Sequence, residues 1–321
     1  MEHEEKEIPW KIRAGAVLSA ALVGTFPAVF ALAMIFLQTE PGYGLLLFLG
    51  PPMLGGALAV NELHRRGFDS KRMALDAVGL TYLASNILPV CFRLEGAVCM
   101  ILAAPLTGLV CVLASNVVYK SLNKDSRTGL LMSGLASALL GIWAVDSLNQ
   151  AIPESSVTTS ILIDAPVEKV FQVASGDIYL DPPTDSVLKF TGSYGIHSRA
   201  IGRGLGSHRL CKFSTGYCLQ QMSGWEENRS ITATVLFNPP PMREIGFVSN
   251  IDPPHQHGYT EMKSWTMEFE SVGTQTRLTR TTRYQMKMHP AFYWTWIGDQ
   301  VISRIHNHKF SWIKKTAEER S

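Results

Sequence analysis

The chain has 321 residues, of which 46% are hydrophobic, and its formal net charge is +2. This length accommodates two domains of ordinary size. The balanced charge gives no strongly basic surface, so we expect no nucleic-acid partner. The five cysteines are scattered without a CxxC pair, which excludes the usual zinc and dithiol motifs, and the sequence implies no cofactor.

Apolar and charged residues are distributed unevenly along the chain. Residues 14–148 hold nearly all of the long apolar runs, whereas residues 157–321 carry 18 Lys and Arg and 15 Asp and Glu. A helix needs about 20 mainly apolar residues to cross the hydrocarbon core of a bilayer. Five stretches meet this requirement: residues 14–38, 43–60, 73–92, 96–119 and 128–148. We therefore expect an α-helical membrane domain of about five transmembrane helices, because the alternative of a soluble bundle would need a polar stripe along each helix.

The loops between these stretches differ sharply in charge. Ten basic residues fall within residues 6–13, 65–72 and 120–127, whereas the alternate loops contain only Arg93. Basic loops remain on the cytoplasmic side of a membrane. We therefore predict an integral protein of the plasma (inner) membrane, with a cytoplasmic segment at residues 1–13 and, after an odd number of spans, an extracytoplasmic C-terminal domain. One span more or fewer would reverse the side of that domain.

Small residues recur at four-residue spacing in the fifth stretch, which allows close packing against another helix. These residues are Gly129, Ser133, Ser137 and Gly141. Charged residues are sparse in all five stretches, so the sequence predicts an anchor in the lipid bilayer and gives no support for a transport path.

A linker at residues 149–156 leads into a domain at residues 157–321. Residues 157–164 alternate between apolar and polar side chains as a half-buried strand does. Ala165-Pro166 ends this strand, and an amphipathic helix follows directly, because Pro is favoured in the first turn of a helix.

The rest of the domain has the pattern of an antiparallel sheet followed by one long helix. We predict strands at residues 207–213, 217–222, 231–237, 259–270 and 276–286. The helix runs from residue 289 to about residue 318, and an apolar stripe follows one side of it. The stripe consists of Trp294, Ile297, Val301 and Ile305.

The stretch ILIDAPVEKVFQVAS at residues 161–175 resembles the opening of the START/Bet v 1-like (SRPBCC) superfamily, most similarly its polyketide cyclase/dehydrase and lipid-transport branch. Three later stretches also fit, namely GLGS at residues 204–207, WEENRSI at 225–231 and TRLTRTTRY at 276–284. The resemblance covers residues 157–318. It implies a helix-grip fold, in which a curved antiparallel sheet wraps around the C-terminal helix and encloses an apolar cavity. Members bind lipids, sterols, polyketides or other hydrophobic molecules, and some are enzymes, so the fold does not decide the function.

Strand alternation independently gives a set of inward-facing residues that could line such a cavity. They are Val235, Phe237, Trp265, Met267, Phe269, Leu278, Arg280 and Tyr284 on the strands, and Trp294, Ile297 and Val301 on the helix. The alternative is that these side chains form an ordinary packed core. Arg280 is the exception among them, because an inward guanidinium could hold an anionic head group or carboxylate.

Cys211 and Cys218 are equidistant from the turn predicted at residues 214–215, so they lie opposite each other across a hairpin. In an oxidising compartment this pair could form a disulfide, and two free thiols are the alternative.

The last helix carries basic and histidine side chains that we do not assign to a site. We interpret its basic residues as a face exposed to solvent, and contact with anionic lipid is the alternative. These are Arg304, Lys309, Lys314 and Lys315. His306 and His308 are two positions apart on a helix and point in different directions, so we predict no metal site there.

Three functional hypotheses follow. The preferred one is a membrane-anchored protein that binds or transfers a hydrophobic, lipid-like ligand. The alternatives are a membrane-tethered cyclase- or hydrolase-like enzyme that uses a group such as Tyr284 or His289, and a sensor or assembly module that docks a partner protein. The sequence identifies no catalytic residue.

Overall fold

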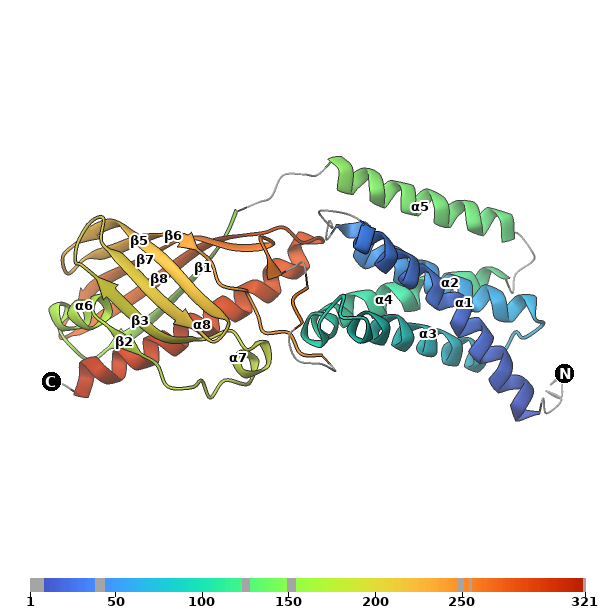
Figure 1. Cartoon of the computed structure of the whole chain (residues 1–321), viewed down its shortest axis with the longest axis horizontal. Coiled ribbons are helices and arrows are strands. Elements are labelled where there is room, and N and C mark those ends of the chain that lie inside the picture. The colour runs from blue at the N-terminus through green and yellow to red at the C-terminus, as the bar shows by residue number, and fades with distance from the viewer. Residues whose placement is uncertain are drawn as a thin grey trace. The chain divides into compact units, whose positions relative to one another are not determined.

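The computed structural model describes residues 9–37, 44–122, 128–148, 154–246, 251–253 and 256–319. Its contacts divide the chain into two compact units (Figure 1). The first comprises Met1–Gln150 with Ile245–Pro253, and the second comprises Ala151–Glu244 with Pro254–Ser321. The first unit is helical, and the described strands belong to the second.

Five helices form the first unit: α1 (Trp10–Leu37), α2 (Leu45–Arg65), α3 (Lys71–Cys91), α4 (Ala97–Leu122) and α5 (Thr128–Leu148). Helices α1 to α4 are long and apolar enough to cross a membrane, judged over their described residues. In α5 the corresponding described stretch is Gly134–Val145, which is shorter than a span. Four apolar helices are therefore shown, and the fifth span remains a prediction. Helix α1 also begins inside the segment that we expected to precede it.

The outer surfaces of these helices are apolar, as lipid contact requires. Along α1, the side chains of Leu18, Leu22, Phe26 and Phe30 are 58–67% exposed. Their four-residue spacing puts them on one face of the helix. A contiguous apolar surface of this kind marks a membrane or partner contact in a protein.

Glycines bring the helices of the first unit close together. A Cβ atom built on Gly56 of α2 would lie 2.3 Å from Ser115 Oγ and 2.7 Å from the Cys111 carbonyl oxygen on α4. Gly24 of α1 likewise faces the Gly55 carbonyl oxygen at 2.7 Å. Small residues allow such approach because they have little or no side chain to separate the backbones. Close packing by small residues is thus shown on α1, α2 and α4. On α5, where we expected it, a Cβ on Gly141 would meet nothing within 4 Å, and Gly129 and Ser133 lie outside the residues whose surroundings the structure describes.

The second unit is a curved eight-stranded antiparallel sheet with the order β1-β8-β7-β6-β5-β4-β3-β2. Its strands are β1 (Glu154–Ile163), β2 (Ile178–Tyr179), β3 (Gly195–Ile201), β4 (His208–Phe213), β5 (Gly216–Glu226), β6 (Ser230–Phe237), β7 (Thr260–Val272) and β8 (Gln275–Met286). Helices α6 (Val167–Ser175) and α7 (Ser186–Thr191) lie between β1 and β3 in sequence, and α8 (Ala291–Glu319) ends the unit. The sheet wraps around α8 (Figure 1).

Local sequence explains where these elements begin and end. Pro166 caps α6, as the Ala-Pro break predicts. Asp185 caps α7 by accepting hydrogen bonds from the backbone N–H groups of Val187 and Leu188. The β7–β8 turn contains Gly273 at φ +64°, a conformation that favours glycine. The residue pattern did not predict β2, α7 or β3, and β1 begins three residues before the predicted strand.

The described core of the second unit lies where the sheet meets α6 and the C-terminal half of α8. It includes Ile163, Phe171, Met222, Ile231, Phe269, Leu278, Phe310 and Ile313. The Phe171 ring packs edge-on against Phe269 and Trp225, with centroids 5.0 and 5.4 Å apart. The predicted fold class, an apolar helical domain followed by a sheet wrapped around a long helix, is confirmed.

Candidate functional site

The predicted cavity-lining residues separate into two groups. Most are deeply buried in contact with the core or with α8, namely Trp265, Met267, Phe269, Leu278, Tyr284 and Trp294. Met267, Phe269 and Leu278 belong to the closed core cluster, so packing accounts for them. Val235 on β6 and Ile297 and Val301 on α8 are half-buried. Val235 packs against the core cluster, and a cavity lined by these three residues remains a prediction.

Phe237 is not part of this group, because its side chain is 59% exposed. The β5–β6 pairing explains the difference: Leu219 pairs with Phe237, whereas the next residue, Gln220, pairs with Val235. Leu236 is thus an extra residue in β6. A β-bulge of this kind breaks the alternation on which the prediction depended.

A group that we call the cationic cluster consists of Arg280 on β8, Lys309 on α8 and Trp265 on β7, and Trp265 also belongs to the core cluster. The Arg280 Cζ atom is 5.0 Å from the centroid of the Trp265 ring, and the Lys309 Nζ atom is 5.8 Å from it. The indole Nε1 donates a hydrogen bond of 3.0 Å to Gln220 Oε1. This bond holds the aromatic ring against which both cations rest.

The position of Lys309 corrects the sequence analysis, which put it on a solvated basic face of the last helix. Its side chain is only 8% exposed. The buried residues of α8 include Ile302, His306, Phe310 and Ile313, which recur every three or four positions. Lys309 falls on the same side as these residues, because positions three and four apart share a helix face. The inward orientation of Arg280 follows strand alternation, as expected.

Neither cation of the cluster has an anionic partner among the residues that the structure describes. Arg280 Nε is buried and makes no hydrogen bond. Burial lowers the pKa of Arg280 to about 10. Burial also lowers the pKa of Lys309 well below its usual value, and the charge of Arg280 lowers it further. Arg280 nevertheless keeps some accessible surface.

Arg209 on β4 shows how a buried guanidinium is normally accommodated. It donates hydrogen bonds to the backbone carbonyls of Ala174, Ser175 and Gly176 at the end of α6, and to Ser198 Oγ at 2.9 Å. A cation at a helix C-terminus also interacts favourably with the helix dipole. Arg209 therefore has a structural role and is not available to a ligand.

His306 lies beside the cluster and supplies no charge to balance it. Its Nδ1 atom is 2.8 Å from Thr159 Oγ1, and its Nε2 atom is 2.7 Å from Thr282 Oγ1. Burial lowers the pKa of His306 to about 2, with a further contribution from Arg280 and Lys309. The ring is neutral at pH 7, so one nitrogen donates and the other accepts. No cluster of three His, Cys, Asp or Glu side chains suited to a metal occurs among the described residues.

Tyr284 joins the sheet to α8. Its hydroxyl donates to Asp299 Oδ1 at 2.6 Å and to the Thr295 carbonyl oxygen at 3.1 Å. Burial and the Asp299 carboxylate raise the pKa of Tyr284 above its usual value. A buried phenol that is held in this way is poorly suited to act as a general base.

The order of elements in the second unit is diagnostic. The first and last strands, β1 and β8, pair with each other, two helices follow β1, a meander connects β3 to β8, and α8 lies across the concave face. The second unit therefore has a helix-grip fold, in which a curved antiparallel sheet surrounds a long C-terminal helix.

No family model and no curated protein matches the chain. Among solved structures it is similar to norcoclaurine synthase from Thalictrum flavum, with 11% identity, 54% of this chain and 92% of that chain covered, and a TM-score of 0.36. The Zhui aromatase/cyclase from Streptomyces sp. R1128 has 13% identity, 52% and 96% coverage and a TM-score of 0.36. The Aha1 dimer from Colwellia psychrerythraea has 16% identity, 49% and 96% coverage and a TM-score of 0.28. Identities this low carry no ligand over to this chain.

In the helix-grip domain, Cys211 on β4 and Cys218 on β5 are direct partners across the predicted hairpin. Both are buried free thiols, and Cys211 Sγ lies 3.3 Å from Ser198 Oγ. Burial raises the pKa of Cys218 to about 12, so its thiol stays protonated. The disulfide remains a prediction.

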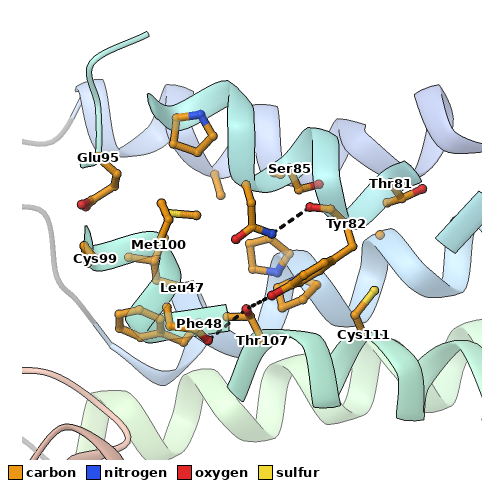
Figure 2. Close-up of a pocket in the computed structure, with 18 residues that line it drawn as sticks. Leu47, Phe48, Thr81, Tyr82, Ser85, Glu95, Cys99, Met100, Thr107 and Cys111 are labelled. Carbon is orange, nitrogen blue, oxygen red and sulfur yellow. Dashed lines mark hydrogen bonds between the residues drawn. The ribbon is translucent and has the colours of Figure 1, made fainter. Parts of the chain in front are cut away.

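A hollow lies inside the first unit, between α1, α2, α3 and α4 (Figure 2). Its volume is about 110 Å³, and most of its lining is apolar. Tyr82 projects into it, donates to the Ala104 carbonyl oxygen at 2.8 Å and shares a hydrogen bond of 2.9 Å with Thr107 Oγ1. Small-molecule sites usually measure about 300–1,000 Å³. This hollow is therefore too small for a whole lipid. Pro51 and Pro52 of α2 and Pro89 of α3 are among the residues that line it.

Proposed function

We propose that this protein is anchored in a membrane and binds or transfers a hydrophobic, lipid-like ligand within its helix-grip domain. The observation that carries the proposal is Arg280, whose buried Nε atom has no hydrogen-bond partner although the residue keeps some accessible surface. Val235, Ile297 and Val301 are half-buried apolar residues of the same domain, and we propose that they line the ligand site. A concave apolar site with a few polar groups is the usual form of a ligand pocket.

The apolar helices explain why such a domain would be attached to a bilayer. A predicted linker of about eight residues would keep the domain near the lipid surface. We also propose that the domain lies outside the cytoplasm. The support is the charge pattern: Lys11 lies at the N-terminal end of α1, and Arg65 and Lys120 lie at the C-terminal ends of α2 and α4. These ends would share the cytoplasmic face if the helices cross the membrane in turn.

The test is native mass spectrometry of the full chain purified in a mild detergent, followed by extraction of bound molecules. We expect a lipid-like molecule at a stoichiometry near one. Val301→Phe should displace it by filling the interior, whereas Asn307→Phe, at an exposed position of the same helix, should not. A chain that carries no such molecule and takes up none from added lipid would overturn the proposal.

A further inference from the structure

Two cations share one aromatic ring in the interior of the helix-grip domain without a described anion beside them. Arg280 and Lys309 lie 5.0 and 5.8 Å from the centroid of the Trp265 ring. A buried charge is normally paired or bound to a metal, because removal from water is costly. The acidic groups that interact with both cations are the thiols of Cys211 and Cys218. A protonated thiol provides no negative charge.

We infer that the cationic cluster binds the anionic group of the ligand, and that the ligand is a single-chain anionic amphiphile with a carboxylate or phosphate head. This inference rests on the proposed function, because it specifies the ligand of the same site. The guanidinium offers a planar fork of N–H donors that fits two oxygen atoms at once, and the ammonium adds a second charge. Arg280 Nε is buried and has no hydrogen-bond partner, so its N–H group is available to donate to a ligand.

The surroundings determine the direction of the chain. On the side of Phe310 and Ile313 the interior is a closed core, so no tail fits there. On the other side, Val301 and Ile297 are half-buried. At 1.5 Å per residue, they lie about 12 and 18 Å from Lys309 along α8. The head group would therefore sit deep in the domain, and the apolar chain would extend along α8 toward its N-terminal end.

The other polar groups nearby are already occupied. Arg209 is bound to the carbonyls at the end of α6. Thr159 and Thr282 bond to His306, and Gln220 bonds to Trp265. Arg280 and Lys309 are thus the charged groups left for a ligand among the described residues of the interior. A neutral lipid of the same length would leave both cations without a counter-charge.

The experiment uses the full chain in detergent and three photoactivatable probes of equal chain length: a diazirine fatty acid, its methyl ester and the matching alkyl phosphate. Cross-linked peptides locate the bound chain, and competition gives the affinities. We expect cross-links in α8 and β6, and at least a tenfold preference for the acid or the phosphate over the ester. The better of the two anions identifies the head group.

Variants then assign the preference to the cluster. Arg280→Met and Lys309→Met should each lower the affinity for the charged probe at least tenfold. Binding of the ester should stay the same, and this result would show that the domain is still folded. Arg283→Met on β8 and Lys315→Met on α8 are the controls, because those side chains are 65% and 70% exposed. Equal binding of acid and ester, or a preference that survives Arg280→Met, would overturn this inference and leave the proposed function standing. Failure of all three probes to label the domain would overturn both.

Discussion

Replacement of Lys309 by Met should stabilise the ligand-free helix-grip domain. Met is similar in length to Lys, so the substitution removes the charge and keeps most of the packing. The separation between the charges of Arg280 and Lys309 cannot exceed the sum of their distances to the Trp265 centroid, about 11 Å. At an effective dielectric constant of about 20, their repulsion is then at least about 1.5 kcal/mol.

Two further effects act in opposite directions. The substitution removes the cost of burying an ammonium group, and it loses a cation–π contact of about 0.5–2 kcal/mol. We therefore expect a net stabilisation of about 1–2 kcal/mol, which for a domain of this size raises the melting temperature by about 2–4 °C per kcal/mol. The assay is thermal unfolding of the delipidated full chain, with hydrogen exchange of peptides from α8 and β8 to assign the transition to this domain.

The pH dependence provides an internal check. Because the pKa of Lys309 is lowered in the folded state, the unfolded chain binds more protons between that lowered value and the usual value of 10.5. The stability of the unmodified domain should therefore rise with pH across this window, and Lys309→Met should lack the rise. Lys315→Met is the control for removal of an exposed lysine. A destabilisation of more than about 1 kcal/mol by Lys309→Met would show that Lys309 has a favourable partner and would refute the reasoning.

Three other predictions concern different parts of the chain. His306 is neutral in the folded domain because its pKa is lowered to about 2. The free energy of unfolding should therefore fall as the pH is lowered from about 6.5 toward 2, by at most about 1.4 kcal/mol per pH unit. Denaturant titrations measure this, and an equal dependence of the unfolding free energy on pH in the unmodified chain and in His306→Gln would contradict it. Gly56→Ala should destabilise the helical unit by about 1–3 kcal/mol, because its Cβ would lie 2.3 Å from Ser115 Oγ. Gly79→Ala should be neutral, because a Cβ there would meet nothing within 4 Å. Unfolding of the two variants in detergent measures the difference. A periplasmic-type reporter fused after residue 321 should be active if all five helices cross the membrane, and activity of a cytoplasmic reporter there would mean an even number of spans.

Residue spacing predicted six of the eight strands and the last helix, because alternation and the Ala-Pro break are local signals. It failed at Phe237, because a bulge at Leu236 changes which side chains face inward, and a bulge depends on pairing with another strand. It also failed at Lys309. The predicted apolar stripe from Trp294 to Ile305 turns gradually around the axis of the helix. Toward the C-terminus, the buried side of α8 includes His306 and Lys309. A search for polar residues in phase with Ile302 and Ile313 would have found both.

The helical unit shows a different limit of sequence reasoning. Four-residue spacing of small side chains pointed to α5, yet the closest backbone contacts involve Gly24, Gly55 and Gly56. Many transmembrane helices contain small residues, and only the arrangement of the helices decides which of them meet. The same holds for the hollow beside Tyr82, because it exists where four helices with separate prolines diverge.

Arg209 and Arg280 are both inward-facing arginines of one sheet, and the contrast between them supports the proposed ligand site. Arg209 donates hydrogen bonds to three backbone carbonyls and a serine hydroxyl. Arg280 lies against an aromatic ring that a second cation also contacts. Hydrophobic residues at the positions of Arg280 and Lys309 would serve a purely structural interior better, because unpaired buried charges cost stability. Natural sequences depart from consistent packing mainly where a site requires it. The stability lost at these two positions is therefore best explained by a ligand that brings the missing negative charge.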